Sequence, residues 1–373
     1  MDSPFSSARN TPEHDSFVHF IRSAPFVAAH SDAETLDQCV PNATNYVEKI
    51  QSATINLASC LEGDGRPVII TDAFSRWPAL EKWNFEFFRQ RYGQTLVKVN
   101  DRAPARHADR ESKAGMQQTH SVSLGEYIQY VENLPSTLEK LEGTQNSNRA
   151  KQGNESTSTN AAPFYLNGWR AFSQHPELAE DCPGPGFLRG IDQSREILRA
   201  LEAALLGKVS SKENTSFHPD PWSGITANLK KVFMGPPGTI TRLHFDAGAA
   251  HGYLGQVVGR KLFVLFPPTD TPFLYRIEGE TETEQSVIDP LDPCSSSTYP
   301  LCNLASPVAF VLHPMEAVII PQGWWHYAVA LDASITVMQN FYHAPTNAKG
   351  MVQLVLKSIA GLKLAAGGTQ KPV

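Results

Sequence analysis

Three side chains that could hold a metal ion lie in two separate segments of the chain. His244 and Asp246 stand two positions apart in Thr241-Arg-Leu-His-Phe-Asp. In a β-strand, side chains at positions i and i+2 point to the same face, with Phe245 turned the other way. His326, in Pro-Gln-Gly-Trp-Trp-His, is the candidate for a second imidazole. Two imidazoles and a carboxylate form the ligand set that binds non-haem Fe(II) and leaves coordination positions open.

Both segments lie in strand-like surroundings. The apolar run at residues 317–320 leads into a Pro/Gly turn before His326, and another apolar run at 262–266 follows the first segment. A His-x-Asp motif alone is weak, since it occurs by chance at strand ends. Its combination with a distal histidine after a Pro/Gly turn favours a metal site, in which zinc or manganese would be alternatives to iron.

Several blocks of sequence extend this pattern to a resemblance. They are Val232-Phe-Met-Gly-Pro-Pro, Gly259-Arg-Lys, Trp324-Trp-His and Ser334-Ile-Thr-Val-Met-Gln-Asn-Phe. With them the chain resembles the Jumonji C (JmjC) family from about residue 67 to residue 341. It is most similar to the small JmjC hydroxylases, which include the bifunctional arginine demethylase and lysyl-hydroxylase and the asparaginyl hydroxylase of hypoxia-inducible factor.

The resemblance implies an α+β fold whose core is a cupin-type double-stranded β-helix (jelly roll) with flanking helices. It also implies Fe(II), with 2-oxoglutarate as co-substrate and dioxygen as oxidant. Lys261 matches the cation that receives the distal carboxylate of 2-oxoglutarate, a role suited to a compact ammonium group. Tyr165 and Thr241 match hydroxyl positions that help to hold the same carboxylate. Asn340 matches a position beside the iron, although an asparagine at a strand end could also cap a turn.

The sequence departs from the family pattern at one place. Related hydroxylases carry an asparagine a few residues after His-x-Asp, near the co-substrate. Here the candidate positions are Gly252 and Leu254, with His251 adjacent. We expect His251 to be an exposed loop histidine, with substitution for the asparagine as the alternative.

Composition limits the classes of partner and compartment. The chain has 373 residues and a net charge of −6, which does not favour a grip on nucleic acid through phosphates but does not exclude it. Five scattered cysteines without a Cys-x-x-Cys motif suggest reduced thiols, hence a cytoplasmic or nuclear protein. No signal peptide and no apolar run of about 20 residues is evident, so we expect no membrane association.

Three regions are predicted. Residues 1–62 form a helical arm, with residues 46–57 in an amphipathic pattern, and this arm could mediate a homodimer. Residues 63–345 form the JmjC/cupin-like catalytic domain, interrupted by a disordered insertion at about 143–162 and a loop excursion at 269–307. Residues 346–373 form a C-terminal helix and tail. The acidic excursion reads as a solvated surface loop that could attract a basic peptide.

The predicted function is an Fe(II)- and 2-oxoglutarate-dependent dioxygenase that hydroxylates a protein side chain. A protein or peptide is therefore the expected substrate. An N-methyl-lysine or N-methyl-arginine demethylase is the first alternative, and hydroxylation of an RNA nucleoside is another. A catalytically silent cupin that acts as a binding module is the alternative from outside the enzymes.

Overall fold

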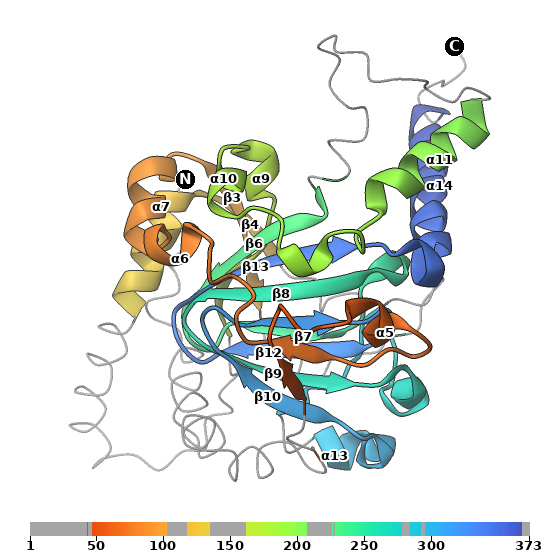
Figure 1. Cartoon of the computed structure of the whole chain (residues 1–373). Coiled ribbons are helices and arrows are strands. Elements are labelled where there is room, and N and C mark those ends of the chain that lie inside the picture. Colours follow the sequence, from red (N-terminus) through yellow and green to blue (C-terminus); the bar gives the residue numbers. More distant parts are fainter. Residues whose placement is uncertain are drawn as a thin grey trace, which may run out of the picture.

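The computed structural model describes residues 43, 47–102, 118–134, 162–206, 226, 228–277, 284–291 and 295–367. In these residues the strands form two sheets that face each other (Figure 1). The larger sheet contains, in spatial order, β1 (Glu48–Ile50), β2 (Val68–Ile70), β11 (Ala317–Ile320), β8 (His251–Val258), β13 (Ser334–Phe341), β6 (Lys230–Gly235), β5 (Ala162–Trp169), β3 (Leu96–Arg102) and β4 (Gln118–Ser123). The smaller sheet contains β10 (Val308–Leu312), β9 (Lys261–Phe266), β12 (Trp325–Ala330) and β7 (Ile240–His244).

Almost all strand pairs are antiparallel, and the strands alternate between the two sheets from β6 to β9 and again from β10 to β13, as in a jelly roll. The predicted α+β jelly-roll core is confirmed. The α-helices that flank it are α5 (Leu57–Leu61), α6 (Ala79–Lys82), α7 (Phe85–Tyr92), an unlabelled helix at 124–134, α9 (Ala171–Gln174), α10 (Leu178–Asp181), α11 (Ser194–Leu206), α13 (Ser295–Thr298) and α14 (Ala344–Gly367). Short 3-10 helices are η4 (Gly186–Leu188), η5 (Ala247–Ala249), η6 (Pro268–Phe273) and η7 (Pro300–Leu304).

The space between the sheets is lined by alternate residues of each strand. In β9, Phe263 and Leu265 point inward to a cluster that also contains Phe310 and Val318. Leu262, Val264 and Phe266 of the same strand point outward to a different cluster. Both faces of the four-stranded sheet are therefore buried at β9, which explains why residues 262–266 read as an unbroken apolar run.

Different segments cover the two outer faces. The helices near the N-terminus and α9 and α10 pack on the nine-stranded sheet, where Trp83, Phe88 and Phe172 join its core (Figure 1). The described part of the excursion packs on the four-stranded sheet through Leu274, Ile288, Leu291 and Ala305. The expectation of a solvated loop is wrong for these residues, because the outward apolar side chains of β9 and β12 need cover.

The N-terminal prediction also needs correction. Residues 48–50 form a strand, β1, which pairs in parallel with β2, rather than part of an amphipathic helix. This segment therefore belongs to the large sheet. Residues 1–42 of the predicted arm, and residues 143–161 of the predicted insertion, lie outside the described residues. The C-terminal helix is present as α14, which contacts α11 and η5. Among the described residues, no helix has the length and apolar character needed to cross a bilayer.

Candidate functional site

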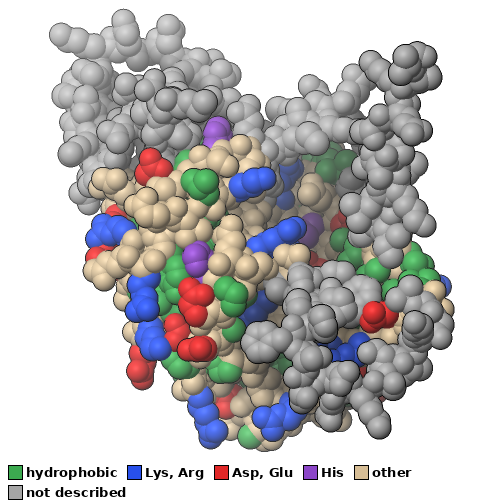
Figure 2. Space-filling view, turned by 90° about the horizontal axis from the view of Figure 1, so that it is seen from above, with side chains coloured by type: hydrophobic (Ala, Val, Ile, Leu, Met, Phe, Trp, Pro, Cys, Tyr) green, Lys and Arg blue, Asp and Glu red, His purple; other side chains and the backbone are tan. Residues whose placement is uncertain are grey.

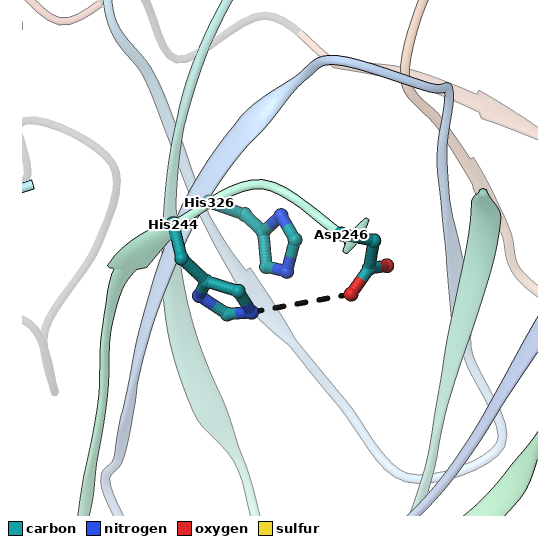
Figure 3. A group of neighbouring side chains, drawn as sticks. All are labelled: His244, Asp246 and His326. Carbon is teal, nitrogen blue, oxygen red and sulfur yellow. Dashed lines mark ion pairs between the residues drawn. The ribbon is translucent and has the colours of Figure 1, made fainter. Parts of the chain in front are cut away.

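The two histidines face each other across a strand pair. His244 ends β7 and His326 lies near the start of β12, and the two residues are register partners. Their ring centroids are 4.1 Å apart. Figure 3 shows both rings pointing toward the same space. The cross-strand pairing is what brings residues 82 positions apart in the sequence into one site.

A β-bulge sets the face that His244 occupies. His326 pairs with His244 while Ala328 pairs with Thr241, so between these pairs one residue on β12 opposes two on β7. Strict alternation would send Thr241 and His244 to opposite faces, whereas the extra residue brings both into the same cavity. Sequence spacing alone did not predict this bulge.

Asp246 follows two residues later in extended backbone, with φ −69° and ψ 132°, just before η5. Its carboxylate therefore points back toward the histidines, with Oδ1 4.0 Å from Nε2 of His244 (Figure 3). Phe245 turns away and packs its ring against Trp325, as the two-residue spacing predicts. One donor atom from each of His244, Asp246 and His326 lies within 4.8 Å of the others.

Hydrogen bonds orient all three groups. Nδ1 of His244 lies 2.7 Å from the carbonyl oxygen of Arg242, and Nδ1 of His326 lies 3.1 Å from that of Trp324. A carbonyl accepts only, so each Nδ1 carries the proton and each Nε2 presents the lone pair that can bind a metal. Nδ2 of Asn340 donates to Oδ2 of Asp246 at 2.8 Å. Outer partners of this kind fix metal ligands in place, and the donor set fits Fe(II).

A second group of residues lies deeper between the sheets. Lys261, the first residue of β9, is 3% exposed, and its ammonium donates to the Tyr165 hydroxyl at 3.1 Å. No carboxylate of the described residues forms an ion pair with Lys261. A buried ammonium with one phenol partner fits an incoming carboxylate. Thr241 lines the same space, so the structure brings together the candidate metal ligands and the three residues expected to hold the co-substrate carboxylate, while Asn340 adjoins them through Asp246.

These residues share one cavity of about 310 Å³. His244 and Asp246 are partly exposed and lie toward its mouth, His326 is buried behind them, and Lys261 and Tyr165 lie at its deep end. Apolar side chains complete the wall, namely Phe233, Leu254, Phe263, Ala328 and Met338. The volume and the two polar ends suit a small dicarboxylate that reaches from the metal ligands to the lysine.

The prediction that His251 is an exposed loop histidine is wrong. His251 is fully buried, accepts from the backbone N–H of Gln322 at 3.0 Å and contacts the Thr346 hydroxyl at 2.8 Å. Burial, with His343 nearby, lowers its pKa to about 4. It does not line the cavity. Gly252, by contrast, lies against the site: a Cβ there would be 3.1 Å from Oδ2 of Asp246.

Four polar residues of the cavity were missed by sequence reasoning: Asn167, Lys231, Arg242 and Gln285. Lys231 and Asn167 could have been found by alternation, since each stands two positions from a cavity residue, Phe233 and Tyr165. Gln285 could not have been found in this way, because it reaches the site only through the pairing of residues 284–286 with the end of β7. Phe245 N–H donates to Glu284 O, and Ser286 N–H donates to Leu243 O, each at 3.0 Å.

Comparison with known proteins agrees with this geometry. Residues 55–348 match the cupin-like domain family. Lysine-specific demethylase 8 of Xenopus tropicalis is 26% identical over 273 residues, 73% of this chain and 47% of that protein. Jumonji C domain-containing protein 5 of Drosophila melanogaster is 26% identical over 281 residues, 74% and 55% of the two chains. Arginine-specific demethylase JMJ20 of Arabidopsis thaliana is 20% identical over 309 residues, 80% and 57%.

Together, the jelly roll and its His-Asp-His site define a cupin-like oxygenase fold. The chain belongs to the JmjC family of cupin-like proteins. Members of this family are 2-oxoglutarate-dependent oxygenases that use Fe(II). The chain spans about half the length of the curated relatives it matches.

Proposed function

We propose that this protein uses Fe(II) and 2-oxoglutarate to hydroxylate a side chain of a protein substrate. The observation that carries the proposal is one cavity with a facial His-Asp-His set at its mouth and a buried ammonium–phenol pair at its deep end. The two ends match the two ends of a keto dicarboxylate. The cysteines that are described, Cys60, Cys182 and Cys302, are free thiols, which supports a reducing cytoplasmic or nuclear compartment.

The residues of the chain would divide the work as follows. Nε2 of His244, Nε2 of His326 and a carboxylate oxygen of Asp246 would hold the metal, with Asn340 keeping Asp246 in its orientation. Lys261, Tyr165 and Thr241 would bind the distal carboxylate of the co-substrate. The apolar wall around Phe263 and Met338 would exclude water from the oxidised carbon. Bound iron would supply oxidation by dioxygen coupled to decarboxylation of 2-oxoglutarate.

Demethylation of N-methyl-lysine or N-methyl-arginine is a second candidate. The similarity of the chain to proteins named as a lysine-specific and an arginine-specific demethylase favours this candidate. The two reactions separate cleanly in their products, since hydroxylation adds one oxygen to the substrate while demethylation removes a methyl group as formaldehyde.

The first experiment measures succinate formed from 2-oxoglutarate with added Fe(II), in air and under nitrogen, beside a His244→Ala variant. We expect turnover that needs iron and oxygen and is absent in the variant. Mass spectrometry of peptide substrates then distinguishes a gain of one oxygen from loss of a methyl group. Metal binding without any succinate would contradict the enzyme and favour the silent binding module.

A further inference from the structure

Two adjacent lysines at the start of β6 have different surroundings. Because successive strand residues point to opposite faces, Lys230 and Lys231 diverge. The Lys230 ammonium donates to the Cys182 carbonyl at 2.6 Å and lies 4.3 Å from the centre of the Phe172 ring, on the outer face of the sheet. Lys231 lies on the inner face with Phe233 and lines the cavity. Lys230 is part of the packing, whereas Lys231 has no such role.

Among the cavity cations of the described residues, Lys231 is the one whose electrostatic partner is a candidate metal ligand, Asp246. Lys261 donates to Tyr165, and Arg242 is held near the carboxylate of Asp289. For Lys231 the described residues supply neither a hydrogen bond nor an ion pair, although burial lowers its pKa and the charge of Asp246 opposes that shift. Arg170, a like charge, also acts on the Lys231 ammonium. A partly buried ammonium of this kind retains unused donors for a ligand.

The backbone makes room for Lys231 at this place. Gly168 lies at the bulge between β5 and β6 and has a φ of +81°, which favours glycine. The Lys231 side chain runs across it, with Cδ 3.4 Å from where a Cβ of Gly168 would stand. A residue with a side chain at position 168 would therefore be both strained and in contact with the lysine.

The position along β6 separates Lys231 from the co-substrate end. Gly235 adjoins Tyr165, and the Phe233 ring lies 5.8 Å from the Lys261 ammonium. Lys231 is two residues further along the same face, a displacement of about 7 Å toward Asp246 and the mouth. Figure 2 shows Lys and Arg side chains beside a histidine where this face of the molecule is hollowed. Lys231 thus lies on the side of the metal ligands, where the oxidised carbon of a substrate would stand, rather than beside the site expected for the distal carboxylate of 2-oxoglutarate.

The net charge of the cavity with Fe(II) and 2-oxoglutarate bound would then select among substrates. The distal carboxylate of 2-oxoglutarate would balance Lys261, and the metal would be balanced by Asp246 and the other carboxylate of the co-substrate. Arg242 already has Asp289. Because Asp246 would bind the metal, Lys231 would then be left as one uncompensated positive charge in a partly desolvated site, where like charges repel most strongly. A methylated ammonium or guanidinium group would meet that repulsion, whereas a carboxylate would be attracted.

We propose that Lys231 binds a carboxylate group of the prime substrate, next to the carbon that is oxidised, so that the enzyme prefers acidic over neutral and cationic targets. This inference rests on the proposed function of the cavity. It places substrate selection within the cavity and not on the acidic excursion, which sequence reasoning linked to basic peptides.

The test measures binding without turnover. The full-length protein is loaded with Fe(II) and 2-oxoglutarate under nitrogen. Three fluorescent nonapeptide pools are titrated, with neutral flanks and a central Asp or Glu, Asn or Gln, or N-methylated Lys or Arg. We expect the acidic pool to bind about tenfold more tightly than the neutral pool, as for one hydrogen bond to a charged group, and the cationic pool to bind most weakly.

The variants assign that preference to one side chain. Lys231→Met should reduce the ratio of acidic to neutral affinity to about one, Lys231→Glu should reverse it, and Lys231→Arg should keep most of it. Lys98→Met is the matched control, because Lys98 is an exposed strand lysine that does not line the cavity. Thermal unfolding of each variant checks its fold, and the reversed preference expected of Lys231→Glu tests the role of Lys231 if the methionine variant is unstable.

The outcomes separate this inference from the proposed function. Equal binding of the pools by the wild-type protein, no binding of any pool, or a preference unchanged in Lys231→Met overturns the role of Lys231. Failure to form succinate in air overturns the oxygenase instead. In a further arm, N-acetylaspartate competes with the acidic pool. Strong competition supports the carboxylate site and assigns the carboxylate to a small molecule, while weak competition assigns it to a peptide.

Discussion

The two ends of the cavity are built differently. At the deep end, Lys261 and Tyr165 are 3% and 1% exposed and bond to each other. At the mouth, the side chains of His244 and Asp246 are 28% and 15% exposed, and Lys231 is also partly exposed. The deep end is enclosed and shaped for one ligand, while the mouth keeps lone pairs and donors open. We infer that the deep end fixes the co-substrate and the mouth adapts to the prime substrate.

This difference follows from the two sheets. The four-stranded sheet is buried on both faces and supplies Lys261, Thr241 and both histidines. The nine-stranded sheet supplies Tyr165, Lys231 and Asn340, and its bulge at Gly168 opens beside the mouth. Substitutions at the mouth and at the deep end should therefore affect different ligands, which four predictions examine.

The largest effect is expected for Asp246→Ala. Outer partners of metal ligands already account for about 10- to 100-fold in metal affinity, so loss of a ligand itself should weaken Fe(II) binding by more than about 100-fold. Succinate formation should disappear. Metal content after dialysis and anaerobic titration measure the change. Asp64→Ala, an exposed aspartate in a turn, is the control. Normal metal affinity in Asp246→Ala would remove Asp246 from the ligand set.

Lys261→Met should impair ligand binding at the deep end of the cavity and leave metal binding at the mouth nearly unchanged. We expect the dissociation constant for 2-oxoglutarate to rise about 100-fold, since a charge-assisted hydrogen bond and its ion pair are lost inside a dry cavity. Fe(II) affinity should change less than about twofold, because Lys261 contacts none of the three metal ligands. Calorimetric titration of both ligands measures this. Lys231→Met should weaken the binding of 2-oxoglutarate far less. Equal weakening by the two substitutions would contradict the proposal that the two ends of the cavity bind different ligands.

Asn340→Ala tests whether the hydrogen bond from Asn340 fixes the orientation of Asp246 at the mouth. Without the 2.8 Å hydrogen bond to Oδ2, Asp246 can rotate away from the histidines. We expect Fe(II) affinity to fall about tenfold, at the lower end for an outer partner. The neighbouring residue offers the control, because the Gln339 side chain bonds Asp192 on the other face, so Gln339→Ala should leave metal affinity unchanged. An unchanged affinity in Asn340→Ala would favour a purely structural role at the strand end.

The parts of the fold that the sequence predicted share a short-range signal. The strand around Lys261 and the turn before His326 carry apolar runs bounded by Gly and Pro, and these determine both strands locally. Residues 48–50 carry an amphipathic pattern compatible with a helix, but parallel pairing with β2 decides their structure, and such pairing is not encoded locally. The cover supplied by Ile288 and Leu291 likewise depends on a sheet face formed elsewhere.

The site shows the same limit. The metal ligands follow from two-residue spacing and a second motif, but the shared face of Thr241 and His244 needs a bulge that no residue type announces. His251 was expected to be exposed because it follows a run of small residues. It is buried because β8 begins at that residue in the interior of the large sheet, where Gln322 and Thr346 satisfy its ring nitrogens.

The smallest effect is expected at Gly252. This residue is at one of the two positions of this sequence that could correspond to the asparagine of the related hydroxylases. In Gly252→Ala the new Cβ would stand 3.1 Å from Oδ2 of Asp246 and 3.8 Å from Nδ2 of Asn340. The first contact is tight, so the carboxylate must shift by a few tenths of an ångström while its hydrogen bond persists. We expect Fe(II) affinity to fall about threefold, less than for loss of the outer partner itself. Gly184→Ala is the matched control, since nothing lies within 4 Å of its added carbon. A loss larger than that of Asn340→Ala would mean that the backbone beside Asp246, rather than the amide of Asn340, sets the geometry of the mouth.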